Sequence, residues 1–311
     1  MSEYVLRTRD ISKKYGDAYA IKNVSVEIKR GQIYGLIGLN GAGKTTFMRS
    51  VVGLISPTCG EVELFGQTGE KALQRGRRRI GQIIETPAVY PNMTAEQNLN
   101  IQCIQAGVPD KGVVKQTLDL VGLADTGKKK DKNFSLGMKQ RLALAMAMIT
   151  NPEFLILDEP VNGLDPRGII EIRELMRRLA RDRGLTLLVS SHLLDELAQV
   201  ATHYGIIDRG NLVKQLSAEE LALESRQHIR ITTRDSAKAL ALLKENFGVT
   251  DYQAVSANEL WIREQTDRTG EMNTLLVQKG IVVESIGVTE QRLEEYFVNL
   301  TGGMKSYLQE K

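Results

Sequence analysis

The first two thirds of the chain alternate between short apolar runs and longer stretches with helical spacing of apolar side chains. Ile33–Ile37, Phe154–Leu157 and Leu185–Ser190 are the apolar runs. Such runs are typical of strands that are covered on both faces. Because strands and helices follow one another in turn, the pattern predicts an α/β domain with a mostly parallel sheet and helices on both of its faces.

Turn residues and helix caps predict the remaining elements of this region. The apolar alternation predicts amino-terminal strands at Tyr4–Arg9 and Ala20–Ile28, and a hairpin of Tyr204–Asp208 with Leu212–Gln215. Helices are predicted at Lys44–Val52, Ala95–Ile104, Lys111–Val121, Ser135–Thr150, Ile169–Asp182 and Leu193–Thr202.

The pattern changes near residue 217. Strands and helices there follow in the order β-α-β-β-α-β, which is typical of a small split-βαβ sandwich. We therefore predict a domain over residues 1–216 and an accessory α+β domain over 217–311, which is a candidate for an independent regulatory or dimerising module. Its elements are predicted at His228–Thr233, Ser236–Asn246, Tyr252–Ser256, Leu260–Arg263, Asp267–Lys279, Val282–Gly287 and Thr289–Leu300.

Composition narrows the class of protein. The 311 residues are 42% hydrophobic and 25% charged, with a net charge of +3, too small to indicate a nucleic-acid partner. The basic runs Arg75–Arg79 and Lys128–Lys130 are interpreted as solvated surface. No apolar stretch has the ~20 residues that span a bilayer, and the first residues lack the apolar core of a signal peptide. We expect a cytoplasmic protein that reaches the membrane through another polypeptide.

A glycine-rich loop, Gly38-Leu39-Asn40-Gly41-Ala42-Gly43-Lys44-Thr45, fits the phosphate-binding pattern G-x-x-x-x-G-K-[ST]. It lies between a predicted strand and a predicted helix, where backbone N–H groups converge on a phosphate. Lys44 is expected to reach the β- and γ-phosphates of a nucleotide, and Thr45 to place its hydroxyl on Mg²⁺. Nucleotide-binding candidates in this segment are Gly38, Asn40, Gly41, Gly43, Lys44, Thr45 and Thr46.

Two carboxylates, Asp158 and Glu159, end the apolar run Phe154–Leu157. A strand end beside a phosphate loop is where Mg²⁺ needs a ligand, so Asp158 is predicted to hold the metal through water. Glu159 is predicted to orient the water that attacks the γ-phosphate.

The segment Ser135-Leu136-Gly137-Met138-Lys139-Gln140-Arg141 resembles the signature motif of the ABC (ATP-binding cassette) ATPases, usually Leu-Ser-Gly-Gly-Gln. The chain departs from it at Phe134, Leu136 and Met138. The resemblance implies that Ser135 and Gly137 bind the γ-phosphate held by an opposite subunit. It therefore implies a homodimer, or a pair with another ATPase subunit, with two ATP molecules at the seam.

Other positions match the same family. The resemblance implies that Tyr15 stacks on adenine, that Asp165 in Gly163-Leu164-Asp165 lines the dimer seam, and that His192 contacts the γ-phosphate. The family usually has Gln in the loop between the core and the helical subdomain, and Glu85 takes that place here. A carboxylate there can still bind Mg²⁺ and would repel a γ-phosphate.

The family resemblance covers residues 3–215, and implies a P-loop NTPase core with antiparallel-β and helical subdomains, the latter at about 86–150. The segment around Glu85, the signature segment and Ser190–Leu197 are similar to ATP-binding subunits of bacitracin- and lantibiotic-resistance exporters, and so is the tail Thr289–Gly303. The implied partner is a separate integral-membrane permease, with the chain peripheral on the inner face of the cell membrane. Its docking groove would involve Glu85–Ile104, where Val89, Tyr90, Leu99 and Ile101 are equally consistent with local core.

Two other classes of function fit the sequence less well. ABC ATPases that act on ribosomes or DNA usually carry two cassettes or a long coiled coil, whereas this chain has one phosphate loop and no heptad run. A P-loop GTPase would need an Asn-Lys-x-Asp motif, and the sequence has none. The sequence therefore favours an ATPase that drives export.

Overall fold

The computed structural model describes residues 2–85, 89–109, 112–224, 227–290, 296, 297 and 300. The chain forms two compact units, Met1–Ala218 and Glu219–Lys311. The boundary lies two residues beyond the predicted one. Each unit has its own hydrophobic core and is described separately.

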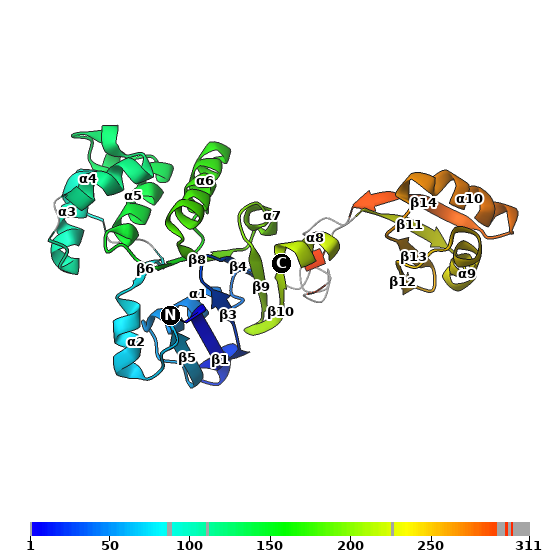
Figure 1. Ribbon diagram of the computed structural model, residues 1–311, viewed down its shortest axis with the longest axis horizontal. Helices are drawn as coiled ribbons and strands as arrows, with labels where there is room; N and C mark the ends of the chain where they lie inside the picture. The colour runs from blue at the N-terminus through cyan, green and yellow to red at the C-terminus, as the bar shows by residue number, and fades with distance from the viewer. Residues whose placement is uncertain are drawn as a thin grey trace. The chain divides into compact units, whose positions relative to one another are not determined.

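A six-stranded sheet is the centre of the first unit, in the order β10-β9-β4-β8-β7-β6 (Figure 1). The five strands from β9 to β6 pair in parallel, and β10 is an antiparallel edge strand. Every residue of β4, β7 and β8 is buried, as the continuous apolar runs predict. The predicted α/β core is thus confirmed. Its strands are β4 (Ile33–Ile37), β6 (Ile80–Ile83), β7 (Phe154–Leu157), β8 (Thr186–Ser191), β9 (His203–Asp208) and β10 (Asn211–Ser217).

A second, antiparallel sheet packs against helix α1 (Lys44–Val52), which shares one hydrophobic core with both sheets. Strand β1 pairs with three partners and continues to Tyr15, beyond its predicted end at Arg9. Bulges in β1 let one long strand serve these partners, which apolar alternation alone does not reveal. Helix α2 (Glu70–Arg77) follows this sheet. The strands are β1 (Tyr4–Tyr15), β2 (Ala18–Val24), β3 (Glu27–Lys29) and β5 (Cys59–Leu64).

Three helices pack together at one side of the first unit: α3 (Ala95–Ala106), α4 (Gly112–Val121) and α5 (Leu136–Met148) (Figure 1). Thr94 starts α3 with a capping box, because its hydroxyl accepts from the Gln97 N–H while the Gln97 side chain accepts from the Thr94 N–H. These helices are the predicted helical subdomain.

Helices α6 (Pro166–Arg183) and α7 (Leu194–Ala198) flank strand β8. The prediction for α7, Leu193–Thr202, is too long. After Ala198 the N–H groups of Val200 and Ala201 turn back to the Leu197 carbonyl, and the Thr202 N–H bonds to Ile33 of β4. The chain must leave the helix there to enter β9.

The second unit contains the predicted β-α-β-β-α-β order and one antiparallel sheet, β12-β13-β11-β14. Helices α9 and α10 pack on one face of that sheet around a small apolar core. Strand β14 extends to Glu290, so the predicted helix Thr289–Leu300 is wrong in its first two residues, and most of the rest, like the tail to Gly303, lies outside the described residues. The elements are α8 (Ala218–Glu224), β11 (Gln227–Thr233), α9 (Ser236–Phe247), β12 (Tyr252–Ser256), β13 (Glu259–Ile262), α10 (Thr269–Gln278) and β14 (Val283–Glu290).

An ion-pair network ties together the starts of three parallel strands. Glu153, before β7, accepts two hydrogen bonds from Arg79 at 2.6 and 2.7 Å and one from Arg30 at 2.9 Å. The Arg79 guanidinium lies 3.7 Å from the centroid of the Phe65 ring. The hydrogen bonds from Arg79, more than those from Arg30, lower the pKa of Glu153 to about 2. The folded state therefore favours the charged form of this carboxylate.

Replacing Glu153 by Gln should destabilise the first unit at pH 7 by about 1 kcal/mol, a value reduced for the partial exposure of the pair. A lowered folded-state pKa stabilises the protein above the unfolded-state pKa, and this contribution is lost as the pH falls towards 2. The gap in unfolding free energy between wild type and variant should therefore narrow as the pH falls from 4.5 to 2. Urea unfolding at pH 7 and at pH 3 measures this gap. Glu174→Gln, at an exposed ion pair on α6, is the control, and an equal gap at both pH values would contradict the assignment.

Candidate functional site

The glycine-rich loop connects the carboxyl end of β4 to α1. Gly41 and Gly43 have left-handed backbones, with φ of 82° and 108°. A Cβ on Gly43 would lie 2.6 Å from the Ala20 carbonyl oxygen, and one on Gly38 would lie 2.5 Å from that of Ile207. Any larger residue at Gly38 or Gly43 would force the backbone apart, so the tight loop requires glycine at both positions.

The amino-terminal end of α1 is suited to an anion. No side chain caps it, and its first turn contains no acidic residue. The first N–H groups of a helix have no partner within the helix and carry a partial positive charge. The predicted phosphate site is therefore electrostatically favourable before any side chain is counted.

Lys44 begins α1 and is only 5% exposed. Its ammonium donates to the carbonyl oxygens of Gly38 at 2.6 Å and Leu39 at 3.2 Å, and lies 3.1 Å from Glu159 Oε1. A buried ammonium needs such partners. These oxygen atoms hold the positive charge at the loop, where phosphate oxygens could take their place.

The carboxylate of Asp158 joins the loop to the parallel sheet. Its Oδ2 accepts from the Thr45 hydroxyl at 2.7 Å, and its Oδ1 accepts from the Ser190 hydroxyl at 2.5 Å. The Ser190 oxygen in turn accepts from the Glu159 N–H at 2.8 Å. Ser190 thus fixes both carboxylate residues, a role the sequence analysis missed. Its position at the end of a buried strand, two residues before His192, is the signal that could have indicated it.

Glu159 and His192 face each other across the strand ends. His192 Nδ1 lies 2.8 Å from Glu159 Oε2. Glu159 has a left-handed backbone with φ of 48°, uncommon for a residue with a side chain and frequent at functional sites. The carboxyl ends of β4, β7 and β8 therefore bring Lys44, Thr45, Asp158, Glu159 and His192 to one place. Asn40 and Gly41 lie exposed at the loop, and Thr46 is partly exposed in the first turn of α1.

The signature residues lie in a second cluster, around a pocket of about 460 Å³ at the starts of α5 and α6. The Ser135 hydroxyl caps α5 by accepting from the Met138 N–H at 3.3 Å, and Asp165 caps α6 by accepting from the Gly168 N–H at 3.0 Å. Gly137 and Gly163 also line this pocket, and none of its lining residues comes from the glycine-rich loop. The structure therefore separates these residues from Lys44 within one chain.

Glu85 and Tyr15 are exposed. Glu85 follows β6 with a left-handed backbone, φ 66°, and forms an ion pair with Arg49 in the last turn of α1. Tyr15, at the end of β1, is 51% exposed, with the Lys13 ammonium 5.3 Å from its ring centroid. The metal role of Glu85 and the adenine stacking of Tyr15 stay predictions.

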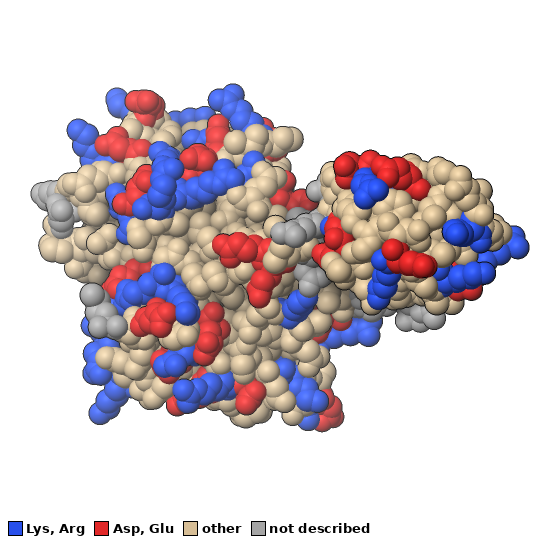
Figure 2. All heavy atoms as spheres, turned by 45° about the vertical axis from the view of Figure 1, so that its right-hand side comes forward, with Lys and Arg blue, Asp and Glu red and all other residues tan. Residues whose placement is uncertain are grey.

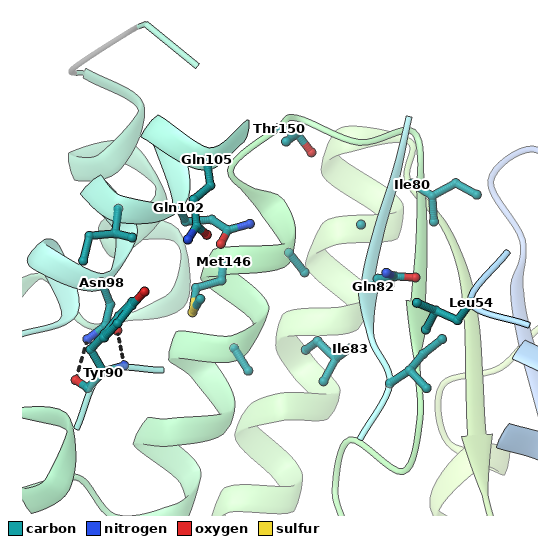
Figure 3. Close-up of a pocket in the computed structure, with 15 residues that line it drawn as sticks. Leu54, Ile80, Gln82, Ile83, Tyr90, Asn98, Gln102, Gln105, Met146 and Thr150 are labelled. Carbon is teal, nitrogen blue, oxygen red and sulfur yellow. Dashed lines mark hydrogen bonds between the residues drawn. The ribbon is translucent and has the colours of Figure 1, made fainter. Parts of the chain in front are cut away.

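A groove of about 430 Å³ opens between β6, α3 and α5 (Figure 3). Tyr90 is held at its edge by Asn98, whose Oδ1 accepts from the Tyr90 N–H at 2.7 Å and whose Nδ2 donates to the Tyr90 carbonyl at 3.2 Å. Ile101 also lines the groove, whereas Leu99 is fully buried in the core. Of the four apolar positions considered from the sequence, two therefore line the groove.

Several classes of feature are absent from the described part of the chain. It contains no helix long and apolar enough to cross a bilayer. It also contains no group of three or more His, Cys, Asp or Glu side chains placed to bind a metal ion. A metal at the Thr45–Asp158 pair would therefore need ligands from a nucleotide or from water.

The chain is similar to known ABC transporter ATP-binding proteins. A family model described as ABC transporter matches residues 21–162. The chain is 41% identical to the bacitracin transport ATP-binding protein BcrA of Bacillus licheniformis over 299 residues, 96% of this chain and 98% of that protein. It is 40% identical to the lantibiotic transport ATP-binding protein SrtF of Streptococcus pyogenes over 209 residues, 67% of this chain and 89% of that protein. The dimeric structure of MJ0796, a bacterial ABC transporter cassette, superimposes with a TM-score of 0.61 at 25% identity, covering 68% of this chain and 98% of that one.

Proposed function

Because the chain belongs to the family of ABC transporter ATP-binding proteins, it binds and hydrolyses ATP, and we propose that this ATPase drives the export of peptide antibiotics through a separate membrane permease. The observation that carries the mechanism is the connected set of Lys44, Thr45, Asp158, Ser190 and Glu159 at one edge of the sheet. Such a set can hold a triphosphate and a water molecule together.

ATP is proposed to bind with its phosphates on the N–H groups of the loop and of the first turn of α1. The Lys44 ammonium would exchange the Gly38 and Leu39 carbonyls for phosphate oxygens, so that a buried charge keeps its partners. Tyr15 would stack on the adenine base, since its ring is exposed.

Mg²⁺ is proposed as the second cofactor. The Thr45 hydroxyl and an Asp158 oxygen meet at 2.7 Å, which places two oxygen ligands of the kind Mg²⁺ prefers beside the phosphate loop. When bound, the metal would neutralise charge on the β- and γ-phosphates. Thr45 would bind it directly and Asp158 through water, while Ser190 keeps the Asp158 carboxylate oriented.

Hydrolysis is proposed to use Glu159 and His192. The oxygen of a water molecule forms a bond to the γ-phosphorus while the bond to the bridging oxygen of ADP breaks, and the water proton leaves towards the Glu159 carboxylate. His192, 2.8 Å from that carboxylate, would orient it and contact the γ-phosphate. Products are ADP and inorganic phosphate.

A dimer is proposed because one chain does not bring Ser135 and Gly137 to its own phosphate loop. Two copies facing each other would place each signature cluster over the partner's nucleotide, a symmetric arrangement that closes on itself. Leu136 and Leu193, beside the signature serine and the histidine, are 51% and 44% exposed, as expected for side chains that a partner covers. The MJ0796 cassette is a dimer in its solved structure.

The groove beside Tyr90 and Ile101 is proposed to receive a cytoplasmic helix of the permease, which would hold the chain at the inner face of the membrane. A partly apolar groove next to Glu85 fits this role, because Glu85 contacts Arg49 on the helix that begins at Lys44. Lys and Arg side chains are interspersed with Asp and Glu on the face that Figure 2 shows. The net charge of the whole chain is only +3, so a nucleic-acid partner is not favoured.

Replacing Ile101 by Lys should prevent the permease from binding, because a charge enters a groove that must be desolvated. The measurement is recovery of the permease when tagged subunit is purified from detergent-solubilised membranes that contain both proteins. Ile104→Lys is the matched control, since Ile104 is on the same helix, is 80% exposed and does not line the groove. Thermal melting checks that both variants fold. Equal recovery of the permease with both variants would reject this groove as the docking site.

A further inference from the structure

Helix α7, which follows His192, is too short to be stable without contacts to the rest of the protein. It has five residues and no side-chain cap, whereas isolated helices need more than ~12 residues to be stable in water. Only Leu194 and Leu197 are buried on it. Tertiary contacts must therefore fix the position of α7 and, with it, the orientation of the preceding His192.

Two arginines on α6 supply such contacts. Arg173 Nη1 donates to Glu196 Oε2 of α7 at 3.1 Å. One turn later, Arg177 donates to the carbonyl of Gln199, the residue that follows α7. Residues four apart lie on the same face of a helix, so α6 holds α7 from one side at two points.

The Arg173–Glu196 pair lies near the backbone segments next to Glu159 and His192. It borders a cavity of about 10 Å³ that is also lined by Pro160 and Val161, which follow Glu159, and by Ser190 and Ser191, which precede His192. Such a volume accommodates one water molecule at most. The pair is therefore packed closely against the backbone on both sides of the Glu159–His192 contact.

Burial makes the loss of one partner of this pair more costly than it would be at an ordinary surface ion pair. The side chains of Arg173 and Glu196 are 13% and 26% exposed. Arg173 Nε is buried and has no hydrogen-bond partner within the described part of the chain. Loss of Glu196 would leave the guanidinium poorly compensated, which is costly in a buried position.

We infer that Arg173 and Glu196 are a positioning pair for hydrolysis: they hold α7 so that His192 stays against Glu159. The inference rests on the proposed roles of these two residues. It also connects them to the proposed dimer seam, because Asp165, which caps the start of α6, lines the signature pocket. Movement of α6 when two subunits close would reach His192 through this pair.

The test is steady-state ATPase kinetics of the full chain carrying Arg173→Met or Glu196→Gln. Each variant should lower kcat about 10-fold and change the KM for ATP less than about twofold, since the phosphate loop is untouched. The double variant should be no slower than either single one, because both remove the same contact. Arg178→Met, on an exposed position of the same helix, is the matched control and should retain wild-type kcat.

The reversed pair Arg173→Glu with Glu196→Arg gives a second criterion, because recovery in the combination requires the two side chains to interact. Each reversal alone puts like charges together and should be slower than the neutral variants, and the combination should recover kcat. Unchanged kcat in both neutral variants would overturn the inference, and so would a reversed pair no faster than its single reversals. An inactive wild type would instead reject the proposed function.

Discussion

Replacing Glu159 by Gln should give a protein that binds ATP and loses its turnover. The backbone N–H of Glu159 donates to the Ser190 hydroxyl, and the Glu159 carboxylate contacts His192 and Lys44. The amide has nearly the same size and cannot accept the proton of the attacking water, so kcat should fall ~10²- to 10⁴-fold. Phosphate release measures the rate, and a fluorescent nucleotide measures binding.

The same variant should accumulate as a dimer in the presence of Mg·ATP, because the γ-phosphate that joins the two proposed subunits is not removed. Light scattering after size-exclusion chromatography measures the mass, with ADP as the comparison nucleotide. Glu174→Gln, exposed on α6, is the control for the substitution itself. Full-rate hydrolysis by the Glu159 variant would remove this residue from its proposed role.

Replacing Lys44 by Ala should abolish nucleotide binding at ordinary concentrations. The ammonium is held at the glycine-rich loop by loop carbonyls, and a charge-assisted hydrogen bond to phosphate contributes about 1.5–3 kcal/mol. Two phosphates contacted by one ammonium imply an affinity loss of ~100-fold or more. Isothermal titration with Mg·ATP measures the affinity.

The Lys44 variant also leaves Glu159 without its ion-pair partner, so folding must be checked separately. Thermal melting with and without ATP distinguishes the two effects, because ligand stabilises only a protein that binds it. Lys71→Ala, exposed on α2 in the same unit, is the matched control. Wild-type affinity in the Lys44 variant would contradict the assignment of the loop as the phosphate site.

The departure at Glu85 illustrates how a tertiary contact changes a sequence argument. From the sequence, a carboxylate in place of glutamine should repel a γ-phosphate. The structure pairs Glu85 with Arg49, which comes from α1, so the negative charge is balanced by the helix that carries the phosphate loop. The residue therefore connects α1 to the edge of the groove proposed for the permease.

Local chemistry made much of this protein predictable. The loop from Gly38 to Thr45 can be identified from residues next to one another, since its glycine spacing and the helix start that follows are properties of a few consecutive residues. Caps such as Thr94 and Ser135 are equally local. The buried strand β7 was found with its exact ends, because four consecutive apolar residues are bounded by polar ones on both sides.

Two strands that lack a continuous apolar run were not predicted. The local pattern predicts no strand at β5 or β6, whose pairing with β1 and β7 crosses long stretches of chain. Nor does it assign a role to Ser190, because only the sheet brings this serine to Asp158. Only the tertiary structure shows which acceptor a hydroxyl reaches.

The sequence by itself determined the class of fold and the identity of the phosphate loop, because both follow from short-range periodicity and glycine geometry. The tertiary structure alone decided which residues from separate strands share one hydrogen-bond network, which side of the helical subdomain forms a groove, and that Arg173 reaches Glu196. Contacts between residues far apart in the chain depend on how the strands are ordered in the sheet, and no local pattern records that order.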